Sequence, residues 1–521
     1  MKVSVKRAFC TAMSAMLTLA GAAGLASCGD GGESDPNTLI IDAFEGGYGV
    51  DWLYAIADKF EEKNEGVSVR IYPTEDDSMF GTSLLSGRLT SDIVFERYPY
   101  WERILRPTTI GGTTYECLYE DLTDIYTTDI PGEDVTIEEK LIDGVAEYYR
   151  TDGKYYHFNW AVGVMGILYN EKQWKPNWQL PRTTDELIEV CEQIKSENKI
   201  PFVYSLKNTY WGFYDVWAAQ YDGLEAMADY DEGYDPSGER YTPELVLYQG
   251  FEEALEVLGE LLKDENGYCH PSSLEYTFTD AQIKFLEGEA VMQPNGDWIE
   301  SEMSANFSED EVTIQFMKMP VISSIVDKCP SIQGTPEEKD EILREVVDYV
   351  DGTEGAVLPQ GVSEEDVERI RTARSLMHTT GQEHTAYIPI YSNKKDLAKK
   401  FLQYMASDEA IELYVTASGG YRTMLKYDYD KPELQDAMSS FMKSTNKLTE
   451  ESRLFFMKHK DPIFSLTGYV FMRNGITGWP ETYLSATNPD DYLSAETIYQ
   501  RNYTTLKSQW DNYLATANII R

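Results

Sequence analysis

Basic residues are scarce in this sequence. Its 521 residues include 45 lysines and arginines against 89 aspartates and glutamates, which gives a formal net charge of −44 at pH 7. A surface this acidic repels the phosphates of nucleic acids and the headgroups of anionic lipids. We therefore expect no nucleic acid as a partner, and the charge favours a neutral or cationic ligand.

Cysteine and histidine are also few, and their spacing does not suit a metal or redox site. The six cysteines include no C-x-x-C pair, and none of the five histidines has a second histidine four residues away. The four cysteines beyond the N-terminal segment allow three patterns of two disulfides, or four free thiols. We predict free, mostly buried thiols and no metal or cofactor; these cysteines are Cys117, Cys191, Cys269 and Cys329.

Motifs that mark common catalytic and nucleotide sites are missing as well. The glycine-rich stretch 45–49 lacks G-x-G-x-x-G, and no lysine follows it in the position that a P-loop requires. No G-x-S-x-G elbow occurs. Carboxylates are too numerous for any two to be singled out as the acid and nucleophile of a glycosidase. The sequence gives no catalytic constellation, and we predict a protein that is not an enzyme.

Only one long apolar run occurs, over residues 8–24, and three cations precede it at positions 2, 6 and 7. This pattern is typical of a signal peptide rather than of a membrane span. The run ends in Leu-Ala-Ser-Cys-Gly, which resembles the lipobox of bacterial lipoproteins. The resemblance implies a signal peptide over residues 1–27, cleaved before Cys28, whose sulfur then carries a lipid. An ordinary signal peptide with an unmodified cysteine is the alternative. Residues 28–37 are expected to form a flexible tether.

From residue 38 onward, predicted strands and helices alternate. Residues 38–44 are a continuous apolar run typical of a buried strand, residues 51–62 place apolar side chains on one helical face, and residues 67–72 indicate the next strand. Strand, helix and strand in this order build parallel sheets with right-handed crossovers. Because 521 residues exceed one typical core, we predict an α/β protein with two lobes.

The segment 278–303 continues this alternation. Thr279 with Gln282 three positions later predicts a capping box at the start of a helix. Residues 290–292 then predict a short buried strand, which Pro294 is expected to end because proline cannot donate to a β-ladder.

A tight turn is expected next, over residues 295–296, with Asp297 as the cap of the following helix. Trp298 would then lie at a helix start beside the carboxyl end of a strand. In open α/β sheets this edge is where ligands bind.

The same segment resembles a known family. The pattern F-x-x-G-x-A-x-M at 285–292, followed by G-x-W at 296–298, is similar to a signature of extracellular solute-binding proteins, the receptors of bacterial ABC importers. The carbohydrate-binding branch related to maltose-binding protein fits best. Further stretches that resemble this family lie at 91–96, 152–156, 158–170, 181–187 and 394–420.

The resemblance implies a two-lobed periplasmic-binding-protein-like fold of type II, with a mostly parallel sheet flanked by helices in each lobe and a hinge between the lobes. The first lobe is expected to comprise residues 38–157 with about 381–430. The second is expected to comprise residues 158–334 with about 431–521, and residues 335–380 are predicted to form an acidic helical insertion.

The resemblance also places candidate ligand residues at the cleft between the lobes. Aromatic rings would stack on the apolar face of a sugar, while charged groups would pair with its hydroxyls. Each candidate also has a structural alternative, which is core or hinge packing for the rings and a surface turn or ion pair for the charged groups. The candidates are Trp298, Trp160, Trp211, Tyr48, Glu45, Glu96, Asp297 and Arg422.

These features together predict a substrate-binding lipoprotein of an ABC importer. It would be a monomer held by its Cys28 lipid at the outer face of the bacterial cytoplasmic membrane, at the cell surface or in the periplasm. It would capture a sugar or oligosaccharide and deliver it to the membrane permease. The alternatives are a cell-surface glycoside hydrolase or other carbohydrate-active lipoprotein, and an adhesin with rigid lobes.

Overall fold

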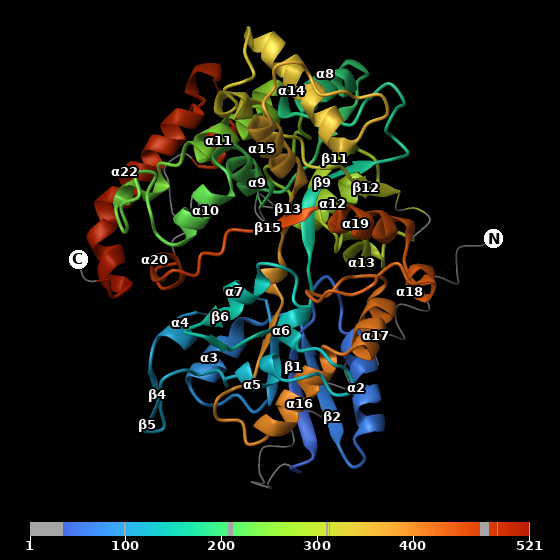
Figure 1. Cartoon of the computed structure of the whole chain (residues 1–521), viewed down its shortest axis with the longest axis vertical. Coiled ribbons are helices and arrows are strands. Elements are labelled where there is room, and N and C mark those ends of the chain that lie inside the picture. The colour runs from blue at the N-terminus through green and yellow to red at the C-terminus, as the bar shows by residue number, and fades with distance from the viewer. Residues whose placement is uncertain are drawn as a thin grey trace, which may run out of the picture.

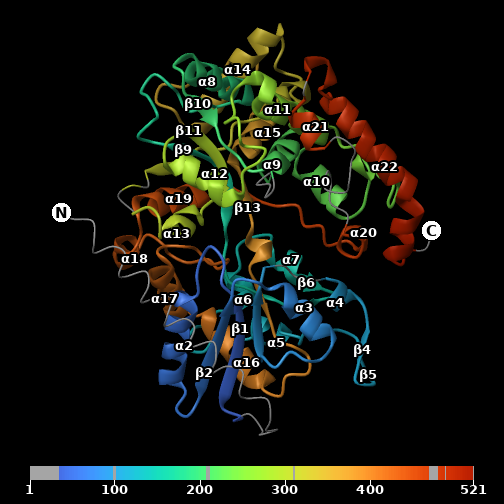
Figure 2. The same cartoon turned by 180° about the vertical axis from the view of Figure 1, so that it is seen from behind.

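The structure is a computed structural model that describes residues 35–97, 101–206, 212–308, 311, 313–468, 479–486 and 488–519. Two large β-sheets organise it, one in each of two lobes that follow one another along the long axis of the molecule (Figures 1 and 2). Helices surround both sheets, so each lobe has the predicted α/β character.

The first lobe is built on a sheet with the strand order β2-β1-β3-β14-β8. The predicted βαβ unit is present as β1 (Thr38–Phe44), α2 (Asp51–Lys63) and β2 (Ser68–Thr74), and β3 (Ile93–Glu96) pairs with β1 in parallel. The other elements of this lobe are α3 (Ser78–Leu85), α4 (Glu102–Leu105), β4 (Thr108–Ile110), β5 (Thr113–Tyr115), α5 (Thr123–Thr127), α6 (Ile137–Lys140), α7 (Val145–Tyr149), β6 (Arg150–Thr151), β7 (Lys154–Tyr155), β8 (Phe158–Asn159), β14 (Thr385–Tyr387), α16 (Lys395–Met405) and α17 (Asp408–Ser418).

The second lobe is built on a sheet with the order β10-β11-β9-β13-β15, with β12 beside β9. Its strands are β9 (Val164–Asn170), β10 (Ile200–Phe202), β11 (Ala290–Gly296), β12 (Ile314–Phe316), β13 (Leu376–Thr379) and β15 (Arg453–Phe455). Its helices are α8 (Thr184–Ser196), α9 (Gly212–Asp222), α10 (Leu224–Asp231), α11 (Gln249–Leu262), α12 (Phe278–Leu286), α13 (Ile299–Met303), α14 (Pro336–Asp351), α15 (Glu364–Ser375), α19 (Ser440–Glu450), α20 (Pro462–Ser465), α21 (Glu481–Leu484) and α22 (Ala495–Thr516).

Each sheet contains one strand that runs against all the others. In the first sheet this strand is β14, which is antiparallel to β3 and β8; in the second it is β9, which is antiparallel to β11, β12 and β13. Both reversed strands are the ones that the chain enters directly from the other lobe, β8 leading to β9 and β13 leading to β14. This pattern arises when a strand leaves one sheet at its carboxyl edge and enters the other sheet at its carboxyl edge. The carboxyl edges of both sheets therefore face the junction between the lobes.

The segments that cross between the lobes are held together by hydrogen bonds. The Trp160 amide donates to the His384 carbonyl at 3.1 Å, and the Val162 amide donates to the Arg422 carbonyl at 2.9 Å. The Thr380 amide donates to the Gly163 carbonyl at 3.0 Å. These bonds join the crossings at 160–163 and 380–384 to the chain that leaves α17, which continues through α18 (Pro432–Asp436) to α19.

The segment 278–303 differs in detail from its prediction. Helix α12 is capped by Thr277, not Thr279: its hydroxyl accepts from the Asp280 amide, and the Asp280 carboxylate accepts from the Thr277 amide. The side-chain amide of Gln282 instead donates to the Glu302 carboxylate at 2.7 Å, so it does not bond to the start of the helix.

Strand β11 does not stop at Pro294 but runs on to Gly296, so the predicted turn at 295–296 is part of a strand. Its pairing with β10 ends at Met292, whereas its pairing with β9 continues to Gly296. Pro294 therefore lies where β11 has a neighbouring strand on one side only, the edge-like position that proline tolerates. Asp297 is not the cap of α13, because Trp298 occupies that position and no side chain caps the helix.

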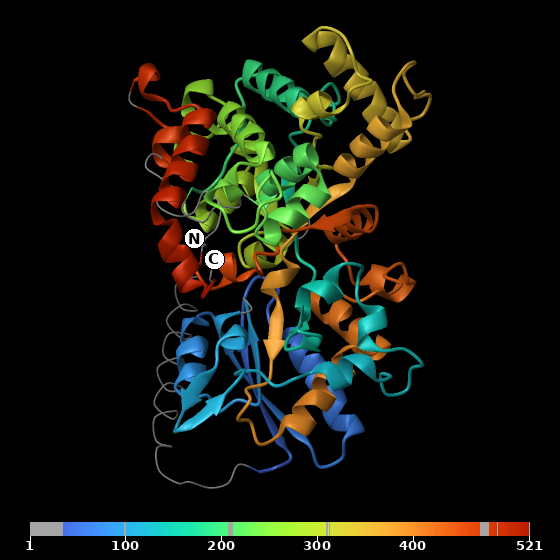
Figure 3. The ribbon, with the colours of Figure 1, turned by 60° about the vertical axis from the view of Figure 1, so that its left-hand side comes forward.

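The segment 335–380 packs on the second lobe through two helices. Helices α14 and α15 bury apolar side chains in the core of that lobe, among them Val346, Val347 and Ile370, and β13 at the end of the segment belongs to the second sheet. In Figure 3, α14 and α15 (gold) extend from the top of the second lobe, and the long C-terminal helix α22 (red) runs along its other side.

Several absences hold for the part of the chain that the structure describes. No helix there is long and apolar enough to cross a membrane. No three histidine, cysteine, aspartate or glutamate side chains there are grouped as metal ligands would be. The four cysteines beyond the N-terminal segment carry free thiols, and those of Cys191 and Cys329 are buried.

Candidate ligand-binding site

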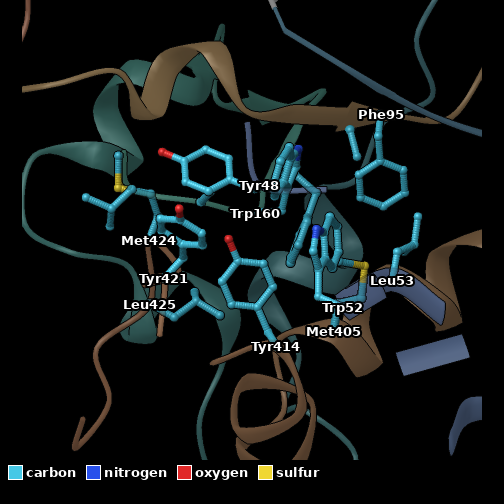
Figure 4. Packing of buried hydrophobic residues seen from close by; sticks show 14 of the residues in the cluster. Tyr48, Trp52, Leu53, Phe95, Trp160, Met405, Tyr414, Tyr421, Met424 and Leu425 are labelled. Atoms are coloured by element: carbon cyan, nitrogen blue, oxygen red, sulfur yellow. The ribbon is translucent and has the colours of Figure 1, made fainter. Parts of the chain in front are cut away.

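Four of the eight candidate ligand residues meet at the junction between the lobes, and we call this set the junction group: Tyr48, Trp160, Asp297 and Trp298. Tyr48 comes from the loop after β1, Trp160 from the crossing after β8, and Asp297 and Trp298 from the end of β11. Each therefore follows a strand that ends at the carboxyl edge of its sheet. Figure 4 shows Tyr48 and Trp160 with the rings packed around them.

The G-x-W pattern at the end of β11 has a steric explanation. A Cβ atom added to Gly296 would come within 2.3 Å of the Trp298 ring, so the indole lies directly over the Gly296 backbone. A Cβ atom on Gly47 would come within 2.7 Å of the Trp298 Cβ, so the loop after β1 lies against the same residue. Trp298 is half-buried. Both glycines therefore allow a close approach: the Trp298 ring lies over the Gly296 backbone, and its Cβ lies against the Gly47 backbone of the first lobe.

Asp297 is buried, and its carboxylate joins the two lobes. The Tyr48 hydroxyl donates to Asp297 Oδ1 at 2.8 Å, and the Val164 amide donates to Oδ2 at 3.3 Å. Burial raises the pKa of Asp297 to about 7, and the two donated hydrogen bonds oppose that rise only in part. The carboxyl group is therefore close to its midpoint of ionisation at neutral pH.

Within the junction group, the Trp160 ring is buried against side chains of the first lobe. Its ring stacks on Trp52 of α2 with 4.8 Å between centroids and 19° between planes, and Tyr48 meets it edge-on at 6.0 Å. It retains 6% of its exposure. These contacts agree with hinge packing, the structural alternative for this residue.

Two further members of this environment, His384 and Tyr421, were not among the eight candidates. The His384 ring lies 4.9 Å from Tyr48 and 5.0 Å from Trp160, and burial lowers its pKa to about 3, so it is neutral. The Tyr421 ring lies 4.3 Å from Tyr48, and its hydroxyl donates to the Asp297 carbonyl at 3.4 Å. His384 lies in a segment without a recognisable motif, so no sequence signal identifies it. Tyr421 directly precedes the candidate Arg422, and this position next to a predicted cleft residue could have identified it.

Glu96 lies inside the first lobe and is not brought to the junction group. It is 1% exposed, accepts from the Tyr119 hydroxyl at 3.1 Å and lies 3.6 Å from the Arg103 guanidinium. Burial raises the pKa of Glu96 to about 8 against the opposing charge of Arg103. Gly81 of α3 is needed at this place, because a Cβ atom there would overlap the guanidinium of Arg103.

The other candidates also stand apart from the junction group. Glu45 is exposed beside it in the loop after β1. Arg422 is engaged elsewhere: it donates to the Asn446 carbonyl at 3.0 Å, pairs with Glu450 at 3.2 Å and lies over the Tyr429 ring. Trp211 and the predicted lipid-bearing Cys28 lie outside the described residues.

The two lobes are in contact at the junction group. One continuous apolar cluster runs from α2 and β1 of the first lobe to Phe285 and Phe316 of the second. Two small cavities lined by described residues have volumes of about 10 Å³ each, and one of them lies beside Trp160. Small-molecule pockets usually measure about 300–1,000 Å³. Apolar side chains of both lobes therefore pack against one another at the junction group.

Comparison with known proteins identifies the family. The family described as "Bacterial extracellular solute-binding protein" matches residues 55–439. The chain belongs to this family. Family membership confirms the resemblance drawn from the G-x-W segment, and it makes this chain one of a class of extracellular binding proteins.

A curated member of this class with a related sequence is the "Multiple sugar-binding protein" of Streptococcus mutans. It is 26% identical over 156 residues, which cover 29% of this chain and 36% of the relative. The match thus spans about a third of that protein.

Solved structures of solute-binding proteins share the fold. A chitin oligosaccharide binding protein matches with a TM-score of 0.55 at 15% identity, covering 90% of this chain and 99% of its own. The maltose-bound MalE3 protein of T. maritima gives 0.54 at 15% identity over the same shares. The GacH receptor of Streptomyces glaucescens gives 0.57 at 12% identity, covering 93% and 99%. The predicted two-lobed binding-protein fold is confirmed.

Proposed function

We propose that this solute-binding protein captures a sugar or oligosaccharide between its two lobes and delivers it to the permease of an ABC importer. The observation that carries the proposal is the meeting of both carboxyl edges at the junction group. There an aromatic platform, a phenol and a carboxyl group from different lobes come together, which is the combination that sugar rings and hydroxyls require.

Trp298 is the first stacking platform of this site, because its indole lies over the backbone of Gly296 and is only half-buried. Asp297 and Tyr48 supply a carboxylate acceptor and a hydroxyl that pair with ligand hydroxyls once the lobes part. Trp160 lies behind Tyr48 and supports its position. Trp211 is a second stacking candidate, and Glu45 is a candidate at the exposed mouth of the site.

Glu96 and Arg422 contribute indirectly in this account. Glu96 is the last residue of β3. Its ion pair with Arg103 and its hydrogen bond from Tyr119 fix the carboxyl end of that strand. Arg422 ties the chain after α17 to α19 through Asn446 and Glu450. Both residues would therefore shape the walls of the site without touching the ligand.

Sugar as the ligand class is supported by the relatives and by charge. The names of the similar proteins refer to sugars, chitin oligosaccharide and maltose. A neutral ligand also suits a chain of net charge −44. A bound ligand that bridges both lobes stabilises the closed state relative to the open one, and this shift is the signal that a permease can recognise.

The test of this function is binding without turnover. We expect calorimetry with neutral oligosaccharides to give one site per chain, and chromatography of the same mixture to return the sugar intact. Shortened sugar would contradict the binding-protein account and favour a cell-surface hydrolase.

We further propose that the chain is a monomeric lipoprotein with the lobe division predicted above. The strands of the first sheet come from 38–159 and 385–387, and those of the second from 164–316, 376–379 and 453–455, which supports a division near those boundaries. The helices of the segment 335–380 would then be an elaboration of the second lobe, and its last strand, β13, is part of that lobe's sheet. The lipid on Cys28 would hold the protein at the outer face of the cytoplasmic membrane.

Cys28→Ser tests the anchor. In a host that processes bacterial lipoproteins, the variant should move from the membrane fraction to the soluble fraction, because serine offers no thiol for the lipid. Fractionation followed by immunoblotting measures the change, and Cys117→Ser is a matched control that should stay with the membranes. A Cys28→Ser variant that remains membrane-bound would rule out this anchor.

A further inference from the structure

The residue that directly follows β3, Arg97, is exposed at the end of this strand. Successive side chains of an extended chain point to opposite sides. Glu96 points into the first lobe and is 1% exposed. The Arg97 side chain, one position later, retains 45% of its exposure. The end of β3 therefore presents a charged side chain outside the lobe core, one residue beyond the candidate Glu96.

The Arg97 guanidinium is held in two directions. Its Nε donates to Asp77 Oδ2 at 3.2 Å and its Nη2 donates to Oδ1 at 2.9 Å, so the carboxylate binds one edge of the group. The Arg97 amide also donates to Asp77 Oδ2, at 3.4 Å. The guanidinium carbon lies over the Phe44 ring, 4.5 Å from its centroid. These contacts fix the orientation of the group and turn Nη1 away from Asp77.

Asp77 makes this ion pair instead of capping a helix. It occupies the N-cap position of α3, where an aspartate side chain usually accepts from a backbone amide of the first turn, but it makes no such bond. The residue is 5% exposed, and a buried carboxylate is unfavourable unless it is paired. The arrangement therefore secures the orientation of Arg97 rather than the start of α3.

Three neighbouring strands bring these residues to one edge of the first sheet. Phe44 is the last residue of β1, Asp77 follows β2 and Arg97 follows β3. Both β2 and β3 pair with β1 in parallel, so the carboxyl ends of all three lie together. This is the edge that faces the junction between the lobes.

The loop after β1 joins this edge to Trp298. A Cβ atom on Gly46 would come within 2.4 Å of the Phe44 ring, so the loop lies against that ring. One position later, a Cβ atom on Gly47 would come within 2.7 Å of the Trp298 Cβ. Arg97 and Trp298 thus lie at the two ends of one continuous series of contacts, which runs from the first lobe to the second.

We propose that Arg97 is the first lobe's hydrogen-bond donor to the ligand: the edge of its guanidinium that carries Nη1 binds two neighbouring hydroxyl oxygens of the sugar that stacks on Trp298. Asp77 and Phe44 are its positioning residues. The inference rests on the sugar-binding function proposed above and names the group that reads the arrangement of hydroxyls.

The chemistry of the pair favours an uncharged ligand. A guanidinium presents its N–H donors in a rigid fork, which matches two oxygen acceptors side by side, as on adjacent carbons of a sugar ring. Asp77 already balances the charge of Arg97, so the pair gives little net attraction for an anionic sugar. A neutral sugar with an adjacent pair of hydroxyls is the class that fits.

Calorimetry with maltotriose, chitotriose, raffinose and xylotriose selects the probe that the wild type binds most tightly. We expect Arg97→Lys to weaken binding of that probe by roughly 10- to 100-fold, the loss that follows from a missing hydrogen bond to a charged donor. Lysine keeps the charge beside Asp77 but cannot present two parallel donors. Circular dichroism confirms that each variant is folded before titration.

Monodeoxy analogues of the selected sugar separate a ligand contact from a structural role. In the wild type, removing a hydroxyl that Arg97 binds should weaken binding by about tenfold or more. In Arg97→Ala the same removal should have little further effect, because the donor is already lost. A purely structural role for Arg97 predicts equal losses in the two proteins.

Asp77→Asn tests the positioning role. It should weaken binding less than Arg97→Ala does, because an amide oxygen still accepts one N–H. It should add nothing to the loss when both changes are combined, because Asp77 acts through Arg97.

Arg240→Lys is the matched control. The Arg240 side chain is 44% exposed, pairs with the buried Asp461 at 2.8 Å and lies 4.6 Å from the centroid of the Tyr241 ring. The Tyr241 carbonyl accepts from Trp510 of α22, which places this pair on the side of the second lobe that α22 covers. Its affinity for the selected sugar should equal that of the wild type.

Two results would overturn the role of Arg97 and leave the sugar-binding function intact. One is an Arg97→Lys variant that binds the selected sugar as tightly as the wild type. The other is a monodeoxy series whose losses are the same in the wild type and in Arg97→Ala. If no probe binds the wild type, the proposed function itself fails and the inference fails with it.

Discussion

Trp298→Ala is expected to weaken sugar binding by roughly 10-fold to a few hundred-fold. Burying an aromatic ring against a ligand is worth on the order of 2–3 kcal/mol, and each 1.4 kcal/mol is about tenfold in affinity. The ring lies over the backbone of Gly296, and it is half-buried before any ligand arrives. Isothermal titration calorimetry with an oligosaccharide that the wild type binds measures the loss of affinity directly.

Trp174→Ala is the control for this substitution. Trp174 is also half-buried and in the second lobe, but it follows β9, whose reversed direction carries its end away from the junction. The control should therefore lower stability and leave affinity unchanged. If Trp298→Ala instead melts at a lower temperature yet binds sugar as tightly as the wild type, Trp298 is structural, and the stacking role passes to other rings.

Trp160→Ala is expected to lower the free energy of unfolding by about 3–5 kcal/mol, the usual cost of removing a fully packed large ring. Trp160 is 6% exposed, stacks on Trp52 and touches Tyr48, His384 and Phe95, so its loss leaves a void at the hinge that few neighbours can fill. Urea unfolding followed by circular dichroism measures the change.

The conservative Trp160→Phe variant should recover part of this loss, because a smaller ring still stacks on Trp52. Affinity for sugar should fall much less than in Trp298→Ala, since Trp52 and Tyr48 cover the Trp160 ring. A Trp160→Ala variant with nearly wild-type stability and strongly reduced affinity would contradict the hinge-packing role and make Trp160 a ligand platform.

The sequence predicted the βαβ beginning of the first lobe well. The predicted strand 38–44 is β1, and the predicted helix 51–62 differs from α2 by one residue at its end. Both predictions depend on local patterns, a continuous apolar run and a helical apolar face, and these patterns act on neighbouring residues only. Tertiary contacts later reinforce them without changing them.

The segment 278–303 was predicted less well because its outcome depends on distant partners. Pro294 ends a strand by local rules, but β9 pairs with the strand through to Gly296 and keeps it extended. Asp297 has the spacing of a helix cap, but Tyr48, 249 positions earlier, provides its hydrogen-bond donor. No local pattern in a single sequence contains such a contact.

The candidate site was predicted in the same uneven way. Tyr48, Trp160 and Trp298 do meet, because each follows a strand that ends at the junction. Glu96 also ends such a strand, but its side chain turns inward to Arg103, which a strand-end argument cannot foresee. His384 came into the site through the second crossing of the chain, which is a property of the topology and not of the residues around it.

The central claim is that the two lobes bind one intact sugar, and native mass spectrometry of the purified protein with a panel of neutral oligosaccharides tests it most directly. The account predicts a complex of one chain with one sugar, whose mass equals that of the uncut oligosaccharide and whose population falls in Trp298→Ala. A mass that corresponds to a shortened sugar, or the absence of a complex with every sugar in the panel, would contradict it.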